Sequence, residues 1–371
     1  MATSMQDSSR LSIPNLPPEL INEILLRLPV KSLLRLTCVS KSWLALISNH
    51  AFMKTHLRLS ANKEDNSHHK LMLRHNHPKY PLKGCSFGSL LYESVTEASD
   101  LDCLVKNGHS LRIVGSVNGL ICLSGGANEL LLWNPAIGKY KKFPDYKPRL
   151  RSTIRCVTYG FGFDEFRDDY KVVGIFRFYE YDSLDHVEVG IYSLSSDSWR
   201  SKDAFPGEMR FVYPSKFLYG KVHWATTAGI ISIDMADEKW GKIEQPSCVE
   251  RGFTFKIGVL GNDLSVLCYD HTCADVWVMK EYGVKESWTR MYTIKFPIDV
   301  ERYVLVRSFF MSNKGEILLV FGSTLMIYDP KGNSIKFAKV TNFGACNGSE
   351  IYLESLVCPM SKKEQNQSSI Q

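Results

Sequence analysis

The chain has 371 residues, of which 44% are apolar and 23% are charged, as in a soluble globular protein with one large domain or two to three ordinary ones. Its net charge of +6 is mild and is not gathered into a long basic run, which argues against nucleic-acid and membrane binding. No apolar run reaches the roughly 18 residues that a membrane-spanning helix needs.

The cysteines are scattered singly along the chain, without a C-x-x-C pair, and the first residues do not resemble a secretory signal. We therefore expect reduced thiols in a protein of the cytoplasm, the nucleus or both. The ten positions are Cys38, Cys85, Cys103, Cys122, Cys156, Cys248, Cys268, Cys273, Cys346 and Cys358.

Residues 1–11 are polar and are expected to be disordered, and residues 12–58 predict a module of three short helices. Pro17 and Pro18 suit the first turn of a helix, and Pro29 ends that helix because proline disfavours the α conformation in the preceding residue. Apolar residues follow at helical spacing up to Ile47. About 45 residues bury too little surface for comfortable stability, so part of this apolar surface is expected to await a partner.

This stretch resembles the F-box family. The resemblance is carried by Leu16-Pro17-x-x-Leu20-x-x-Glu23-Ile24-Leu25-x-Arg27-Leu28-Pro29-Val30-Lys31-Ser32-Leu33-Leu34-Arg35 and by Cys38-Val39-Ser40-Lys41-Ser42-Trp43. It implies docking onto a Skp-type adaptor and, through it, a cullin. The residues expected to bind the adaptor, some of which must instead form the core of the module, are Leu16, Pro17, Leu20, Ile24, Leu28, Pro29, Val30, Leu33, Leu34, Val39, Ser40 and Trp43.

Residues 59–81 are polar and predict a linker with one short strand at 70–74, and residues 82–358 predict an all-β domain. A faint hairpin repeat places large apolar residues about 40 to 60 residues apart, close to the period of propeller blades. These residues are Trp133, Tyr192, Ile233, Trp277 and Tyr328. Glycines before apolar runs suit tight hairpin turns at Gly119, Gly220, Gly261 and Gly315. Residues 359–371 are expected to be a disordered tail.

The β region resembles the F-box-associated domain of plant F-box proteins, which is distantly kelch-like. The resemblance rests on Gly115-Ser116-Val117-Asn118-Gly119-Leu120-Ile121-Cys122, on Trp133-Asn134-Pro135, and on Tyr159-Gly160-Phe161-Gly162-Phe163-Asp164 followed by Asp169-Tyr170-Lys171-Val172-Val173. It implies a propeller-like fold of degenerate kelch type. A Gly-Gly doublet occurs only at Gly125-Gly126, so the blade number and ring closure stay open.

Three clusters could carry chemistry. His68, His69, His75 and His77 lie among solvated residues, and the Cys268, His271 and Cys273 set offers too few converging ligands for zinc, so no metal is expected. The carboxylates Asp164, Glu165, Asp168 and Asp169 could serve a glycosidase, but their alternation with other residues is typical of a polar turn. Four tryptophans are expected in blade cores, namely Trp224, Trp240, Trp277 and Trp288.

These patterns predict a non-catalytic substrate receptor of a Skp–cullin–F-box ubiquitin ligase, without a cofactor, that recruits a target protein. The target is expected to bind loops at one end of the β domain, with 145–155, 178–186 and 248–254 as candidates. A kelch-like scaffold unrelated to ubiquitination and a propeller glycosidase are the alternatives.

Overall fold

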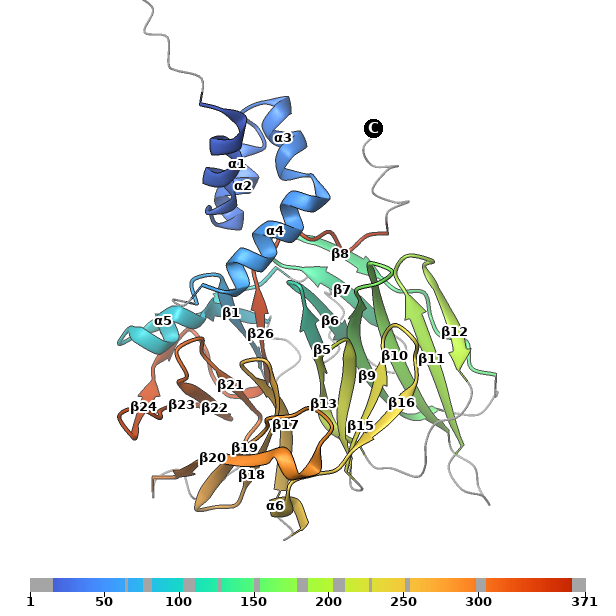
Figure 1. The fold of residues 1–371 in the computed structure, drawn as a ribbon, viewed down its shortest axis with the longest axis vertical. Coiled ribbons are helices and arrows are strands. Elements are labelled where there is room, and N and C mark those ends of the chain that lie inside the picture. Colours follow the sequence, from blue (N-terminus) through green and yellow to red (C-terminus); the bar gives the residue numbers. More distant parts are fainter. Residues whose placement is uncertain are drawn as a thin grey trace, which may run out of the picture.

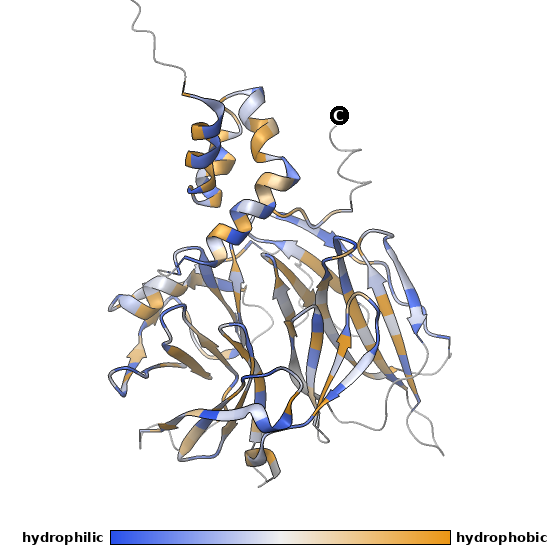
Figure 2. Cartoon of the chain, in the orientation of Figure 1, coloured by the Kyte–Doolittle hydropathy of each residue, from blue (hydrophilic) through white to orange (hydrophobic). Residues whose placement is uncertain are grey.

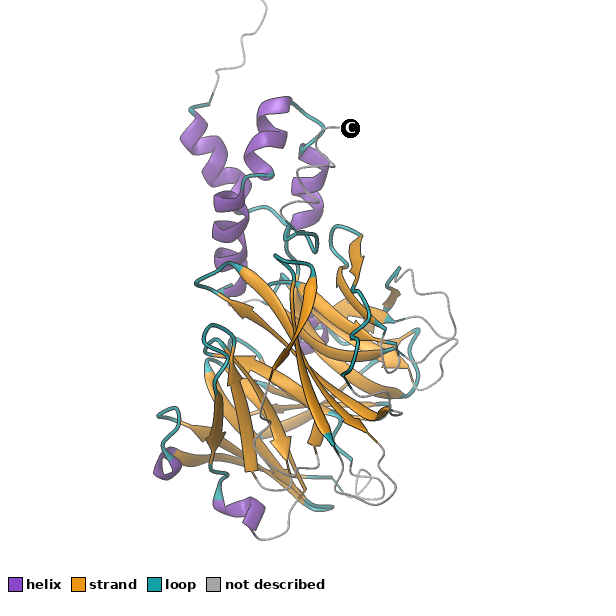
Figure 3. Cartoon of the chain, turned by 90° about the vertical axis from the view of Figure 1, so that its right-hand side faces the viewer, coloured by secondary structure: helices purple, strands orange, loops and turns teal. Residues whose placement is uncertain are grey.

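The computed structural model describes residues 16–63, 66–75, 82–102, 111–125, 129–149, 154–178, 186–202, 211–226, 229–250, 254–297 and 305–361. The predicted disordered ends, 1–11 and most of 359–371, lie outside these ranges. The described chain has a group of helices at one end and, through the rest, sheets with a few short helices (Figures 1 and 3).

The N-terminal segment folds into four helices: α1 (Pro18–Leu26), α2 (Val30–Leu36), α3 (Lys41–Ile47) and α4 (His50–Ala61). Local chemistry places their starts. Pro18 occupies the first helical position of α1, Ser40 Oγ accepts a hydrogen bond from Trp43 N at 3.2 Å, and Asn49 Oδ1 accepts one from Ala51 N at 2.8 Å. The three predicted helices are present, and α4 is a fourth that the pattern did not separate.

Within the described residues, six four-stranded sheets form the blades of a propeller (Figure 1), and the innermost strands of neighbouring blades contact one another in a ring around a central channel. One blade contains β5 (Arg112–Val117), β6 (Leu120–Ser124), β7 (Leu130–Asn134) and β8 (Lys139–Lys142). The next blade contains β9 (Ile154–Asp164), β10 (Asp169–Phe178), β11 (Val187–Ser193) and β12 (Ser198–Lys202). It is followed by β13 (Phe211–Leu218), β14 (Lys221–Thr226), β15 (Gly229–Asp234) and β16 (Trp240–Ile243).

Two further blades continue the same antiparallel order. One contains β17 (Thr254–Leu260), β18 (Asp263–Tyr269), β19 (Cys273–Met279) and β20 (Trp288–Lys295). The other contains β21 (Ser308–Met311), β22 (Ile317–Phe321), β23 (Thr324–Asp329) and β24 (Ser334–Ala338). Short elements lie in the connections of the domain, namely α5 (Phe87–Tyr92), α6 (Ser247–Glu250), η1 (Lys285–Ser287) and the small parallel pair β3 (Thr96–Glu97) with β25 (Val340–Thr341).

The sixth blade closes the ring by joining the two ends of the domain. Its strands are ordered β26 (Cys346–Leu353), β1 (His69–His75), β2 (Lys83–Ser86) and β4 (Ser99–Asp100). The strand expected at 70–74 is therefore present as β1, but it belongs to the propeller. The range 59–81 thus carries the end of α4 and a blade strand, because β1 finds its partner in β26 at the far end of the sequence.

The sequence repeat marks the third strand of five blades. Trp133, Tyr192, Ile233, Trp277 and Tyr328 lie on β7, β11, β15, β19 and β23 respectively. Trp224 and Trp288 are buried between blades, as predicted. Figure 2 shows hydrophobic residues along the strands and the helices alike.

The four predicted hairpin glycines all have positive φ, as tight turns require. Gly119 has a second reason to be glycine. A Cβ on it would lie 2.5 Å from the Leu353 carbonyl oxygen and 2.2 Å from Ser355 Oγ, so the turn after β5 could not approach the chain after β26 with a larger residue.

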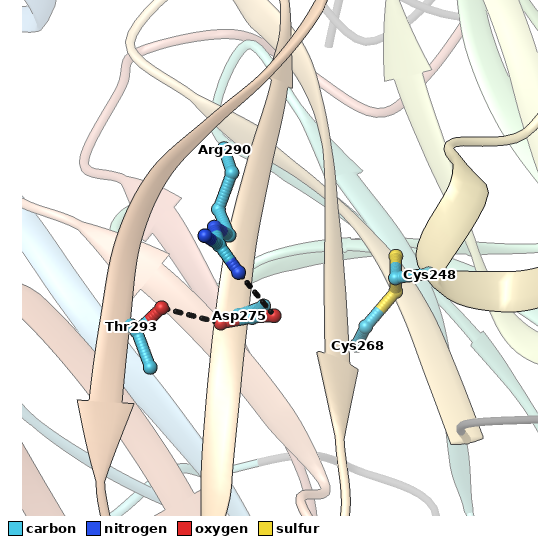
Figure 4. The surroundings of a disulfide bond; sticks show 5 residues. All are labelled: Cys248, Cys268, Asp275, Arg290 and Thr293. Carbon is cyan, nitrogen blue, oxygen red and sulfur yellow. Dashed lines mark hydrogen bonds and ion pairs between the residues drawn. A yellow bond between two sulfur atoms is a disulfide. The ribbon is translucent and has the colours of Figure 1, made fainter. Parts of the chain in front are cut away.

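The prediction of uniformly reduced cysteines is wrong at two positions. Cys248 on α6 and Cys268 on β18 form a disulfide (Figure 4). The two cysteines are 20 residues apart, and they meet because α6 packs against β18. The spacing of the cysteines in the sequence does not indicate this contact. In the same view, Asp275 of β19 accepts a hydrogen bond from Thr293 Oγ1 of β20 at 2.6 Å.

Candidate functional site

The helical module divides the predicted adaptor-binding residues by exposure. Val30 and Leu33 are buried in its core with Leu25 and Ile47. Ser40 caps α3, and Leu28, Leu34 and Trp43 are half-buried. The exposed members of the set are Leu16, Pro17, Leu20, Ile24, Pro29 and Val39.

The exposed members include large apolar side chains. Leu20 and Ile24 are four residues apart and so share one side of α1, and Leu16 lies just before that helix. Together with Val39 and Leu44, they are between 46% and 60% exposed. Leu44 was missed in the sequence because its spacing on α3 did not distinguish it from the core residues. We define the exposed stripe as Leu16, Leu20, Ile24, Val39 and Leu44.

The core of the module is completed by the propeller. Leu356, which follows β26, is buried against Leu25, Val30 and Leu33, and Ala136 and Ile137 from the β7–β8 turn pack at its edge. Residues from the C-terminal end of the domain therefore fill space that the helices leave open. This contact joins the two parts through shared apolar burial.

Asn134 holds the segment that carries Leu356. Its buried side-chain amide donates to the Ser355 carbonyl oxygen at 3.0 Å and to the Val357 carbonyl oxygen at 2.8 Å, and its Oδ1 accepts from Ala136 N at 2.9 Å. The amide nitrogen of Asn134 therefore holds the segment that carries Leu356, and its oxygen holds the turn that carries Ala136. The Trp133-Asn134-Pro135 motif is in this structure a connection between propeller and helices.

Polar contacts along α4 add to this connection. Asp168, in the β9–β10 turn, forms an ion pair with Lys54 at 3.2 Å and lies 3.1 Å from His50 Nε2. At the other end of α4, Asn313 Nδ2 donates to the carbonyl oxygens of Ala61 at 3.3 Å and Lys63 at 2.7 Å. We call the propeller face that bears these turns the helical face.

Two of the four carboxylates considered for catalysis, Asp164 and Asp169, have structural contacts. Asp164 is buried and pairs with Lys171 and Arg167, each at 2.9 Å. Burial opposes ionisation of Asp164, but these hydrogen bonds outweigh it and hold the pKa of its carboxyl below the usual range. Asp169 accepts from Ser195 N at 2.8 Å. Each of these side chains is engaged in holding a turn.

The metal-ligand candidates are separated by the fold. His69 and His75 lie at opposite ends of β1, about 20 Å apart along an extended strand. His77 lies outside the described residues, and Cys268 is in the disulfide. Within the described ranges, no three His, Cys, Asp or Glu side chains gather closely enough to hold a metal ion.

The helical mouth of the central channel opens into a cavity of about 720 Å³. It is lined by the end of α4 and by residues of the inner strands, among them Ser116, Ser215 and Phe310. Lys216 of β13 and Glu350 of β26 bond across the channel here, with Nζ to carboxylate distances of 2.8 and 2.9 Å. They come from opposite blades of the ring.

The three predicted target loops share the opposite face of the propeller. The strands that flank them there end or begin at Ile154, Phe178 and Thr254. Their central residues, 150–153, 179–185 and 251–253, lie outside the described residues. A target bound on this face would leave the exposed stripe uncovered.

Residues 13–55 match the family described as F-box domain, and residues 86–358 match the F-box associated beta propeller domain. The second match spans well over half of the chain. The chain is an F-box protein of this propeller family. The F-box implies binding to a Skp-type adaptor and through it to a cullin, and proteins of this kind are generally non-catalytic adaptors.

Two proteins from Arabidopsis thaliana are similar to this F-box protein over most of its length. This chain is 34% identical to the F-box/kelch-repeat protein At3g23880, over 93% of this chain and 96% of that one. It is 29% identical to the F-box protein CPR1, over 92% of this chain and 88% of that one. Among the described residues, no helix is long and apolar enough to cross a membrane.

Proposed function

We propose that this chain is the substrate receptor of a Skp–cullin–F-box ubiquitin ligase, and that it recruits a target protein for ubiquitination and degradation. The observation that carries this proposal is the exposed stripe on an F-box that is joined firmly to a propeller. The stripe supplies an apolar surface suited to the adaptor, and the propeller supplies a separate face for the target.

The role we assign to the chain is positioning. One end binds the ligase and the other binds the target, so the target is held at high effective concentration near the ubiquitin-charged enzyme. A firm junction matters in such an arrangement because a loose one would spread the target over many orientations. Leu356, Asn134 and Asp168 are the residues that would restrict this motion. The cytoplasm and nucleus are the compartments where we place this function.

The adaptor site is tested with the full chain, because helices cut away from the propeller would lose Leu356 from their core. The chain is co-expressed with a plant Skp-type adaptor, and co-purification is measured for the wild type and for Leu16→Ala with Pro17→Ala. We expect the double variant to lose the adaptor while circular dichroism shows an intact β domain. Leu59→Ala is the matched control, since Leu59 is also exposed but lies on α4, outside the stripe.

Retention of the adaptor by the double variant, with unchanged folding, would refute the assignment of these residues. Absence of adaptor binding by the wild-type chain would favour an interaction scaffold unrelated to ubiquitination. Loss of binding in Leu59→Ala as well would mean that the assay reports the stability of the module rather than its contact surface.

A further inference from the structure

Basic side chains from five blades gather around the central channel, with Lys216 in the cavity at the helical mouth and the others nearer the face opposite the helices. They come from five consecutive blades, counted around the ring from β13 to β5 (Figure 1). Lys256 is near the start of β17, Arg307 directly precedes β21, and Arg112 begins β5. We define the cationic ring as Lys216, Lys256, Arg307, Arg74 and Arg112.

Direct contacts place two members of the ring over the inner strands. The Arg74 guanidinium reaches from β1 across β26, where Nη2 donates to the Asn347 carbonyl oxygen at 3.0 Å. Its Nε lies 3.3 Å from where a Cβ would stand on Gly348, so the side chain runs over the innermost strand of its blade. Lys216 extends across the channel to Glu350.

Adjacent members of the ring act on one another electrostatically. Burial lowers the pKa of Lys256 to about 8, with further lowering by the charges of Arg307 and Lys216. Burial also lowers the pKa of Arg74, against a raising effect of Cys346, and the charges of Arg112 and Arg307 lower it further. Each neighbouring pair therefore lies within electrostatic reach, and holding these cations together costs free energy.

Only part of this charge is balanced within the described chain. Glu350 is engaged by Lys216, whereas Arg112 and Arg307 form no ion pair with any described residue. The hydroxyl of Tyr269 adds an independent observation. It is buried, it has no hydrogen-bond partner among the described residues, and it lies within reach of the Arg307 charge. Buried polar groups are normally satisfied, so a buried hydroxyl within reach of the Arg307 guanidinium, which has no ion pair in the described chain, favours a site for an anionic ligand.

We infer that the cationic ring is the docking point for the target protein, and that it receives an acidic segment of the target's chain, a run of aspartate and glutamate side chains. This inference rests on the proposed function and names the chemistry of the partner. Charge complementarity supports it, since arginine forks bind carboxylates in bidentate fashion and a charged channel mouth concentrates ligands of opposite sign. The three predicted target loops begin and end on this same face.

The probe is a fluorescein-labelled octaglutamate peptide, with octaglutamine as the uncharged comparison. Binding is followed by fluorescence anisotropy on the full chain purified with its Skp-type adaptor, at low and physiological salt. We expect binding of octaglutamate alone, weakened by salt, and a loss of affinity of about tenfold or more in Arg112→Gln with Arg307→Gln. The control is Lys295→Gln with Lys331→Gln, which also removes two positive charges. Lys295 lies on the outer strand β20, Lys331 lies in the β23–β24 turn, and both are exposed. This variant should bind octaglutamate as the wild type does.

Equal weakening in both double variants, or no octaglutamate binding by the wild type, would overturn the inference. A single-stranded oligonucleotide of equal charge that binds more tightly than the peptide, and is lost in Arg112→Gln with Arg307→Gln, would also overturn it, in favour of a nucleic-acid site. Adaptor co-purification is measured on the same samples. Its loss would count against the proposed function, whereas its retention without peptide binding would count against the cationic ring alone.

Discussion

Replacing Leu356 with alanine should loosen the helical module far more than the propeller that carries this residue. Leu356 is 8% exposed and belongs to the small core formed by Leu25, Val30, Leu33, Ile47 and Phe52. Truncating a buried leucine to alanine costs about 2–5 kcal/mol through lost burial and the cavity that remains. We expect about 2–3 kcal/mol here, because the side chain lies at a domain junction where neighbouring groups can partly close the gap.

A loss of this size should be visible as local opening of α1, α2 and α3, since a module this small has little stability to spare. The assay is hydrogen exchange followed by mass spectrometry on the full chain without adaptor. A change of 2–3 kcal/mol raises the exchange rates of protected amides by about 30- to 150-fold. Peptides from the propeller blades should change little.

The matched control is Leu260→Ala. Leu260 is as well buried as Leu356, but it lies in the core between the blades of β17–β20 and β21–β24. This variant should accelerate exchange in those blades and leave the helices unchanged. Unaltered exchange of α1–α3 in Leu356→Ala would contradict the idea that the propeller completes the helical core. The rate of adaptor binding is a second measurement, and an equal rate in Leu356→Ala and Leu260→Ala would contradict the same idea.

Two further predictions concern the propeller itself. His223 is buried, with Nε2 2.6 Å from Tyr282 Oη, and burial lowers its pKa to about 4. Its contribution to the free energy of unfolding should therefore be complete above about pH 6.5. As the pH falls from there toward 4, this contribution should decline by up to about 3 kcal/mol, because the unfolded chain takes up the proton first. Urea unfolding at several pH values should show a shallower acid dependence in His223→Gln, and an unchanged slope would contradict this account. The Cys248–Cys268 disulfide spans 20 residues, and closing such a loop stabilises a fold by about 3 kcal/mol. Dithiothreitol should therefore lower the Tm of the wild type but not that of Cys248→Ser; equal responses in both proteins would argue against a disulfide in solution.

Local sequence chemistry was sufficient for the elements whose causes are local. Pro18, Pro29 and Ser40 begin or separate the helices through the missing N–H or the side-chain cap that each provides. Gly119 and Gly220 mark hairpin turns through their positive φ. The large residues of the third strands repeat because each blade must bury the same face against its neighbour.

The pairings between distant residues could not be obtained in this way. β1 pairs with β26, and nothing in residues 69–75 identifies a partner near residue 350. The same holds for Cys248 with Cys268 and for Asn134 with the segment 355–357. In each pair, the chemical group is evident in the sequence, but its partner is chosen by the closure of the ring.

The amino-acid sequence by itself determined the helical module, the β repeats and the residue types available to each surface, because helix caps, turns and hydrophobic spacing act over a few residues. Only the tertiary structure decided which apolar residues of the F-box are exposed, how the propeller completes the helical core, and which basic residues meet at the channel. Exposure and proximity depend on packing between segments far apart in the chain, and no local pattern encodes that packing.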